Sequence, residues 1–202
     1  DLHLSIRRQR QMCIRDRSKA MKEILQQQEK VLRKVAKEVV LEDIKKPKIK
    51  KVLREMSESL ATQDDGVAIA APQIGYSLRI FVVSGKIFSA QYVSKRGRKT
   101  DAEDLDEASP TPKDLIFINP KISKLSRDKE WIPEGCLSVR PLYGKTYRSL
   151  KATVTAYDEN GKKFTRGGSG LLAQIFQHET DHLNGILFID HAKDVAPEEP
   201  VN

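Results

Sequence analysis

Two histidines stand four residues apart in this sequence, with a glutamate directly after the first, in the segment His178-Glu179-Thr180-Asp181-His182. Residues i and i+4 of an α-helix lie on the same face, so both imidazoles can bind one metal ion. Glu179 would then lie beside that ion, where it could exchange protons with a bound water. The pattern indicates hydrolytic chemistry at a metal centre, with His178 and His182 as ligands and Glu179 as the proton-transfer group.

The segment around the histidines has the features of one helix. An apolar run, 171–176, precedes them, Ser169 is suited to the N-cap position, and Gly185 is suited to the position that ends a helix. These signals predict a helix of about 14–16 residues, which is a common length. The helix alone leaves two alternatives open: a chance occurrence of the pattern, and two histidines that only form surface hydrogen bonds.

A third ligand is available upstream. Hydrolytic metal sites usually have three protein ligands and one open position for water. Cys136 lies in the segment 134–138, EGCLS, where the neighbouring glycine gives the backbone freedom to present a side chain. Cys136 with the two histidines would form a Cys/His/His site, whereas the alternative is a small buried hydrophobic residue. Zincin peptidases take their third ligand downstream, where this chain offers only His191 and Glu198-Glu199.

A third segment, residues 66–75, has the sequence GVAIAAPQIG. Its small residues allow another chain to approach the backbone closely, and Gln73 offers an amide NH2 as a hydrogen-bond donor. By itself the segment could also be a tight turn between a helix and a strand.

Together the segments GVAIAAPQIG, EGCLS and QHETDHLNG resemble the three motifs of the peptide deformylases, in the order of that family. The resemblance spans about residues 22–192. It departs from the family pattern at Ala68, which replaces a glycine in the segment that runs alongside the bound peptide. The extra methyl group would narrow or shift the cleft at that point.

The resemblance implies roles for individual residues. Cys136, His178 and His182 would hold one divalent metal ion, with Fe2+ preferred and Zn2+, Ni2+ or Co2+ also compatible. Glu179 would act first as general base and then as general acid. The remaining residues would act on the substrate: the formyl oxygen would be bound by Gln73 and the N–H of Leu137, the peptide backbone by Val67 beside Ala68, and the methionine side chain by Ile132, Leu171 and Ile175.

The implied fold is α+β, with mixed or antiparallel strands around a C-terminal helix that carries the metal ligands. Residues 28–47 are expected to be irregular with short helical pieces, followed by a helix that starts at Pro47. Strands are predicted at Ile80–Val83 and Leu115–Ile118, and a hairpin turn at Asn160-Gly161. Helical spacing places Ile49, Val52, Leu53, Met56 and Leu60 on the buried side of the first helix.

A chain of 202 residues is expected to form one domain. We expect residues 1–20 to be a basic leader that is non-native or disordered, 21–192 to be the catalytic domain, and 193–202 to be a polar tail. A native basic arm that binds RNA is the alternative for the leader. The polar region 94–113 is expected to be a solvated loop, with a partner-binding insertion as the alternative.

Composition limits the setting in which the protein works. No run of about 18 apolar residues is present, so no transmembrane helix or membrane partner is expected. Two cysteines argue against a disulfide framework and favour a reducing cytoplasm. The resemblance implies N-formylmethionyl nascent peptides as substrates, with transient ribosome association and no specific nucleic acid. The alternatives are a zincin-type metallopeptidase and a non-catalytic ribosome-associated paralogue.

Overall fold

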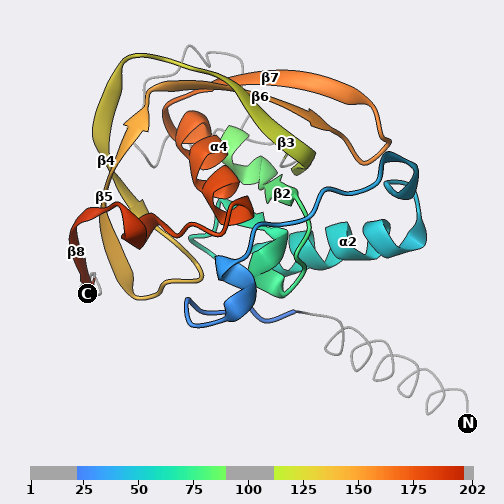
Figure 1. The fold of residues 1–202 in the computed structure, drawn as a ribbon, viewed down its shortest axis with the longest axis horizontal. Helices are drawn as coiled ribbons and strands as arrows, with labels where there is room; N and C mark the ends of the chain where they lie inside the picture. Colours follow the sequence, from blue (N-terminus) through green and yellow to red (C-terminus); the bar gives the residue numbers. More distant parts are fainter. Residues whose placement is uncertain (1–21, 90–111, 198–202) are drawn as a thin grey trace, which may run out of the picture.

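The computed structural model describes residues 22–89 and 112–197, and in this part of the chain two antiparallel sheets surround a C-terminal helix (Figure 1). The α-helices are α2 (Pro47–Ala61) and α4 (Gly170–Leu183). The strands are β1 (Ala68–Ala70), β2 (Ile80–Val83), β3 (Leu115–Leu125), β4 (Lys129–Gly135), β5 (Leu142–Ser149), β6 (Lys151–Tyr157), β7 (Lys163–Ser169) and β8 (Lys193–Pro197). Five 3-10 helices are η1 (Lys30–Arg33), η2 (Leu41–Asp43), η3 (Ala71–Ile74), η4 (Gly85–Phe88) and η5 (Phe188–Asp190). The predicted α+β class is confirmed.

The larger sheet has the order β1-β2-β3-β6-β7 and the smaller has the order β4-β5-β8. All pairs of named strands are antiparallel, and α4 lies against the larger sheet. The predicted hairpin turn joins β6 to β7, where Gly161 adopts a φ of +74° and the Asp158 carboxylate accepts hydrogen bonds from two backbone N–H groups of the turn. Among the described residues, no helix is long and apolar enough to cross a membrane.

Helix α4 begins and ends where the sequence predicts. Ser169 has the extended backbone of an N-cap, although its side chain makes no capping hydrogen bond. Gly185 has a φ of +75°, the left-handed conformation that follows many helices. The last two turns of the helix carry both histidines, and there His178 and Asp181 contact Glu134 and Arg148 of the smaller sheet.

Aromatic side chains fill the space between α4 and the larger sheet. Phe81 and Phe117 stack with ring centroids 4.5 Å apart, and Phe176 of α4 lies 5.3 Å from Phe117. All three are fully buried. On β6, Ala152, Val154 and Ala156 are also buried and leave room for these rings. This cluster fixes the position of α4, and with it the position of the histidines.

We expect Phe176→Ala to lower the free energy of unfolding by about 3–4 kcal/mol, because it removes a fully buried ring and leaves a cavity that the sheet cannot close. Urea denaturation would measure the loss. Phe164→Ala is the matched control, because Phe164 also contacts Phe117 but is only partly buried on β7. Equal losses in the two variants would contradict the assigned packing of α4.

The helix predicted from Pro47 is confirmed as α2, with proline in its first turn. Its predicted apolar face is buried against the larger sheet, at residues Ile49, Val52, Leu53, Met56 and Leu60. The preceding segment contains the two short helices η1 and η2, as expected for an irregular region.

The strands differ more from prediction than the helices do. Strand β3 continues to Leu125, beyond the predicted end at Ile118. Residues 193–197 were expected to belong to a polar tail, but they form β8, which pairs with β5 and extends the smaller sheet. On β4 and β5, Trp131 and Tyr147 pair across the strands with ring centroids 5.3 Å apart. The expected leader 1–20 and most of the region 94–113 lie outside the described residues.

Candidate metal centre

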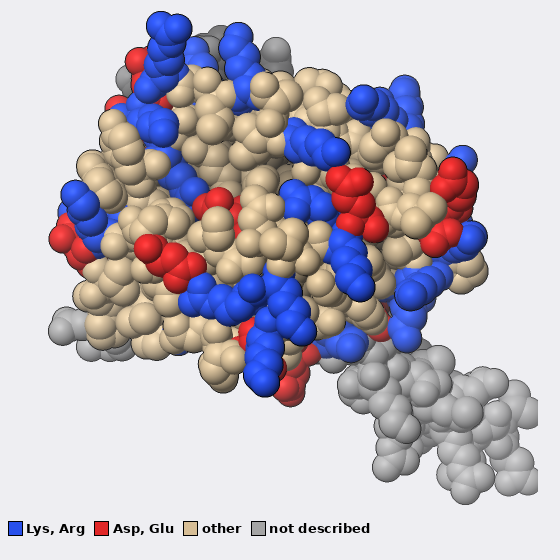
Figure 2. All heavy atoms as spheres, viewed as in Figure 1, with Lys and Arg blue, Asp and Glu red and all other residues tan. Residues whose placement is uncertain are grey.

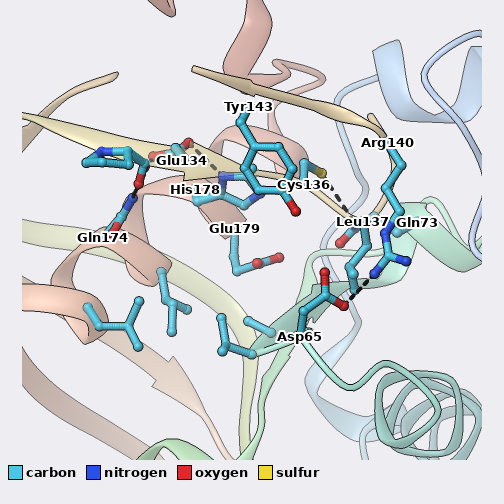
Figure 3. Close-up of a pocket in the computed structure, with 17 residues that line it drawn as sticks. Asp65, Gln73, Glu134, Cys136, Leu137, Arg140, Tyr143, Gln174, His178 and Glu179 are labelled. Carbon is cyan, nitrogen blue, oxygen red and sulfur yellow. Dashed lines mark hydrogen bonds and ion pairs between the residues drawn. The ribbon is translucent and has the colours of Figure 1, made fainter. Parts of the chain in front are cut away.

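The three predicted ligands come together where α4 meets the end of β4. Figure 3 shows two of them, Cys136 and His178. Their ligand atoms all lie within 4.8 Å of one another, and Cys136 Sγ is 3.1 Å from His182 Nε2. Nitrogen and sulfur ligands about 2.0–2.3 Å from a tetrahedral ion lie roughly 3.4–3.7 Å from each other, so the spacing suits one ion. His178 and His182 are on successive turns of α4, and Cys136 follows β4 directly. The residues fit a divalent metal ion with one position left open.

A buried carboxylate orients the first histidine. Glu134 Oε1 lies 2.7 Å from His178 Nδ1, which leaves Nε2 of the ring for the metal. Arg148 of β5 donates to both oxygens of Glu134, at 2.7 and 3.0 Å, and to Asp181 Oδ2 at 2.6 Å. Thr146 donates a further hydrogen bond of 2.7 Å to Glu134. This network ties α4, β4 and β5 together behind the ligands.

Charges in this network are stabilised by their partners. Burial opposes the charge of Glu134, but His178 and Arg148 outweigh it and hold the pKa of this carboxyl well below its usual range. Burial likewise opposes a charge on His178, yet Glu134 and Cys136 raise the pKa of its imidazole. Binding of a metal cation to Nε2 of His178 would therefore displace the proton from that nitrogen, while the Nδ1–H group stays hydrogen-bonded to Glu134. Burial and the charge of His178 lower the pKa of His182, which favours the neutral form that binds metals.

Sequence reasoning gave no role to Glu134, Arg148 or Asp181. Glu134 and Asp181 stand inside the EGCLS and HETDH segments, and their place beside the ligands was the available signal. Arg148 lies outside all three segments. In the register of β4 with β5 it is opposite Glu130, and its side chain reaches Glu134 from there.

We expect Arg148→Ala to lower the free energy of unfolding by about 3 kcal/mol, because it leaves the carboxylate of Glu134 buried without its main partner. Thermal or urea unfolding would measure the loss. Arg54→Ala is the control, since Arg54 forms an exposed i,i+4 pair with Glu58 and its removal should change stability by less than about 0.5 kcal/mol. A similar, small effect in both variants would contradict the structural role of Arg148.

Glu179 lies on α4 between the two histidines and is only 3% exposed. Burial raises the pKa of Glu179 to about 7. Its Oε2 atom has no hydrogen-bond partner among the described residues, and its side chain points into the cavity (Figure 3). A carboxyl with such a pKa can both accept and return a proton near neutral pH.

The side chain of Gln73 is held in place by a backbone group three residues earlier. Its Oε1 accepts a hydrogen bond of 2.8 Å from Ala70 N–H, so its NH2 group points to the ligand loop. There Nε2 lies 3.1 Å from Ser138 Oγ and 3.7 Å from Cys136 Sγ. Leu137 lines the same cavity, between the cysteine and this serine. Two potential donors to a substrate oxygen thus lie beside the metal ligands.

A cavity of about 360 Å³ opens in front of these groups. The predicted residues that line it are Val67, Ala68, Gln73, Cys136, Leu137, Leu171, Ile175, His178 and Glu179, while His182 is buried behind it. Ile132 is not among the lining residues, whereas its neighbour Pro133 is. Residues that sequence reasoning missed also line it: Asp65, Gly66, Pro133, Glu134, Gly135, Arg140, Tyr143 and Gln174.

Gly135 shows why a glycine precedes the ligand cysteine. A Cβ atom at this position would lie 2.4 Å from Cε1 of Tyr143, whose ring packs over the backbone. The close approach allows Tyr143 to form one wall of the cavity beside Cys136 (Figure 3).

A buried glutamate between two histidines, with a cysteine beside them at a spacing that suits one metal ion and an open cavity in front, is the arrangement of a metal-dependent hydrolase. The sequence model of the family described as polypeptide deformylase matches residues 21–198. The chain belongs to this family. The match extends past the expected end of the domain at 192 and includes β8.

Several peptide deformylases match most of this chain. Peptide deformylase 2 of Clostridium acetobutylicum is 37% identical over 172 residues, which are 85% of this chain and 95% of the relative. The crystal structure of a Synechococcus elongatus peptide deformylase in complex with actinonin has a TM-score of 0.67, is 33% identical, and is matched over 86% of this chain and 81% of its own. A Met-Ala-Ser-bound Acinetobacter baumannii peptide deformylase has a TM-score of 0.68 at 26% identity, over 85% of this chain and 99% of its own.

Proposed function

We propose that this protein removes the formyl group from the N-formylmethionine of newly made proteins and releases formate. The observation that supports this function best is the meeting of Cys136, His178 and His182 beside Glu179 at the base of an open cavity. The position of the third ligand upstream, together with family membership, decides against a zincin-type peptidase. The full set of ligands, base and donors argues against a non-catalytic paralogue.

The reaction is the attack of water on the formyl carbon, followed by cleavage of the C–N bond. A divalent ion held by Cys136, His178 and His182 would supply Lewis acidity, which would lower the pKa of water towards about 7. Glu179 accepts a proton from the attacking water and later delivers one to the leaving amine, so its own protonation state is restored at the end of the reaction. The NH2 of Gln73 and the backbone N–H of Leu137 donate to the oxygen that becomes negative, each contributing about 3 kcal/mol.

We propose Fe2+ as the ion, with Zn2+, Ni2+ and Co2+ as alternatives that the same ligands accept. One soft thiolate and two imidazoles suit all four ions, so the ligand set restricts the metal without selecting one. The thiolate ligand must stay reduced, which favours activity in the cytosol. Transient association with the ribosome would bring the protein to its nascent substrates.

The peptide is placed by the walls of the cavity. Val67 directly precedes β1, and both Val67 and Ala68 line the cavity. We propose that the substrate backbone pairs with Val67 as an added strand. Leu171 and Ile175 project from α4 into the same cavity and form an apolar surface for the methionine side chain.

The direct test uses anaerobically purified protein loaded with each metal in turn. Formate release from formyl-Met-Ala-Ser should be detected, and acetyl-Met-Ala-Ser should be hydrolysed far more slowly. A chelated sample would show the activity that does not depend on metal. The absence of formate with every metal would overturn the proposed function.

A further inference from the structure

An ion pair lies at one end of the catalytic cavity. Asp65 Oδ1 and Arg140 Nη2 are 2.5 Å apart, and both residues line the cavity. Asp65 lies between α2 and β1, whereas Arg140 follows the loop that carries Cys136. The pair thus connects two opposite walls. In the view of Figure 3, Glu179 lies between this pair and Gln174.

The ion pair does little for the stability of the fold. The two side chains are 45% and 55% exposed. Exposed pairs of this kind contribute about 0–1 kcal/mol, because water screens the charges and ordering the side chains costs entropy. The position of the pair in the cavity therefore points to the substrate, not to folding.

The direction of a bound peptide follows from burial, and this step rests on the proposed function. With the formyl group at the metal and the methionine opposite Val67, the chain could continue towards Ile69 or towards Asp65. Ile69 is fully buried in β1, so only the direction towards Asp65 is open. The peptide therefore runs towards Asp65 and Arg140, and because side chains alternate along an extended chain, the third peptide residue reaches this end of the cavity on the same side as the methionine.

Arg140 can bind a second carboxylate while it holds Asp65. A guanidinium has five N–H donors, and the only hydrogen bond found for Arg140 among the described side chains uses Nη2. Another edge of the planar group can therefore accept a second partner, which a lysine could do less well. Basic and acidic side chains are interspersed over the face shown in Figure 2, so a selective charge contact requires a specific local group such as this one.

We propose that Arg140 is a specificity-determining residue that favours peptides with an acidic third residue. The carboxylate of that residue binds the free edge of the Arg140 guanidinium, while Asp65 stays bound to the edge that carries Nη2. The net charge of +8 also attracts an acidic peptide to the protein at long range. A lysine at the third position would instead be repelled by Arg140 and could reach only Asp65.

The test compares formyl-Met-Ala-Glu, formyl-Met-Ala-Gln and formyl-Met-Ala-Lys, all with amidated C-termini so that only the third side chain differs in charge. Wild-type protein loaded with Ni2+ should favour Glu over Lys by about fivefold in kcat/KM at low ionic strength. The difference should lie in KM, because the contact is equally strong in ground and transition states. Salt at about 0.5 M should reduce it.

Three variants assign the preference to its source. Arg140→Gln should lower the Glu:Lys ratio to one or below, because Asp65 then remains without its cation and favours lysine. Asp65→Asn should raise the ratio above the wild-type value, because it removes the negative charge nearest to the peptide carboxylate. Arg127→Gln, which removes an equal charge from an exposed position outside the cavity, should keep the wild-type ratio.

A wild-type preference for Lys, no preference, or an unchanged ratio in Arg140→Gln would each overturn the assignment. Calorimetric titration with the products Met-Ala-Glu-amide and Met-Ala-Lys-amide measures the same ratio without turnover. If no peptide releases formate but the products bind with the expected ratio, the proposed function fails and the specificity of Arg140 stands.

Discussion

Replacement of Glu179 by glutamine is expected to lower kcat by about 10³–10⁴-fold while the metal content per chain stays unchanged. The side chain is buried beside the ligands but is not one of them, and an amide of equal size can occupy its place. That amide cannot accept the proton of the attacking water or return it to the amine. Steady-state deformylation and metal analysis on the same preparation would measure both quantities.

Glu58→Gln provides the control for this loss, because it makes the same chemical change on the exposed face of α2. Its kcat should equal that of wild type. A Glu179→Gln enzyme with near wild-type kcat would show that another group transfers the proton. Loss of the metal together with activity would show that Glu179 supports the ligands instead.

Cys136→Ala is expected to weaken metal binding by several orders of magnitude, because it removes one of three ligands and the only thiolate of the cluster. Oxidation gives a second readout of the same ligand: the Fe2+ form should lose activity in air or peroxide, and the Ni2+ form should lose it more slowly. Metal per chain after exhaustive dialysis measures the loss directly.

Val139→Ala separates ligation from packing. Val139 is fully buried in the cluster that Cys136 packs against, so its truncation should cost roughly 1–3 kcal/mol with the metal retained. If Cys136→Ala behaves in the same way, with full metal occupancy and only a modest stability loss, the cysteine is a packing residue and the deformylase mechanism loses its third ligand.

The helices were predicted well because their patterns reflect simple burial. In α2 every predicted apolar position faces the larger sheet, and in α4 the flanking serine and glycine mark the ends of the helix. His178 and His182 lie on one of these periodic helices, and Cys136 lies in a short segment of distinctive residues. The periodicity of α4 was therefore sufficient to place His178 and His182 together, whereas Cys136 was joined to them through the resemblance to the deformylase motifs.

Strands β4 and β5 could not be predicted in the same way. Their inward positions carry Glu134, Thr146 and Arg148, so the buried face of the smaller sheet is polar where a strand pattern requires apolar residues. The inward charges are compensated by one another and by α4. Such compensation depends on tertiary contacts, which no local pattern contains.

The ion pair at the end of the cavity could not be predicted from the sequence for a related reason. Asp65 and Arg140 are separated by 75 positions, and each alone is an ordinary charged residue at the surface. The role that the resemblance implies for Ile132 stays a prediction, because its neighbour Pro133 lines the cavity in the structure and Ile132 does not. The β4 segment shows no apolar alternation from which its inward positions could be predicted.

The chain contains a single tryptophan, Trp131, and it lies on the strand that also forms a wall of the catalytic cavity. The ring is 42% exposed, with Tyr147 beside it and Lys193 Nζ 4.3 Å from its centroid. Indole emission responds to nearby charge and to water, so any shift of β4 that accompanies peptide binding changes the fluorescence of this one residue. The protein thus contains an intrinsic optical probe whose signal comes from a single known position and can be read without added labels.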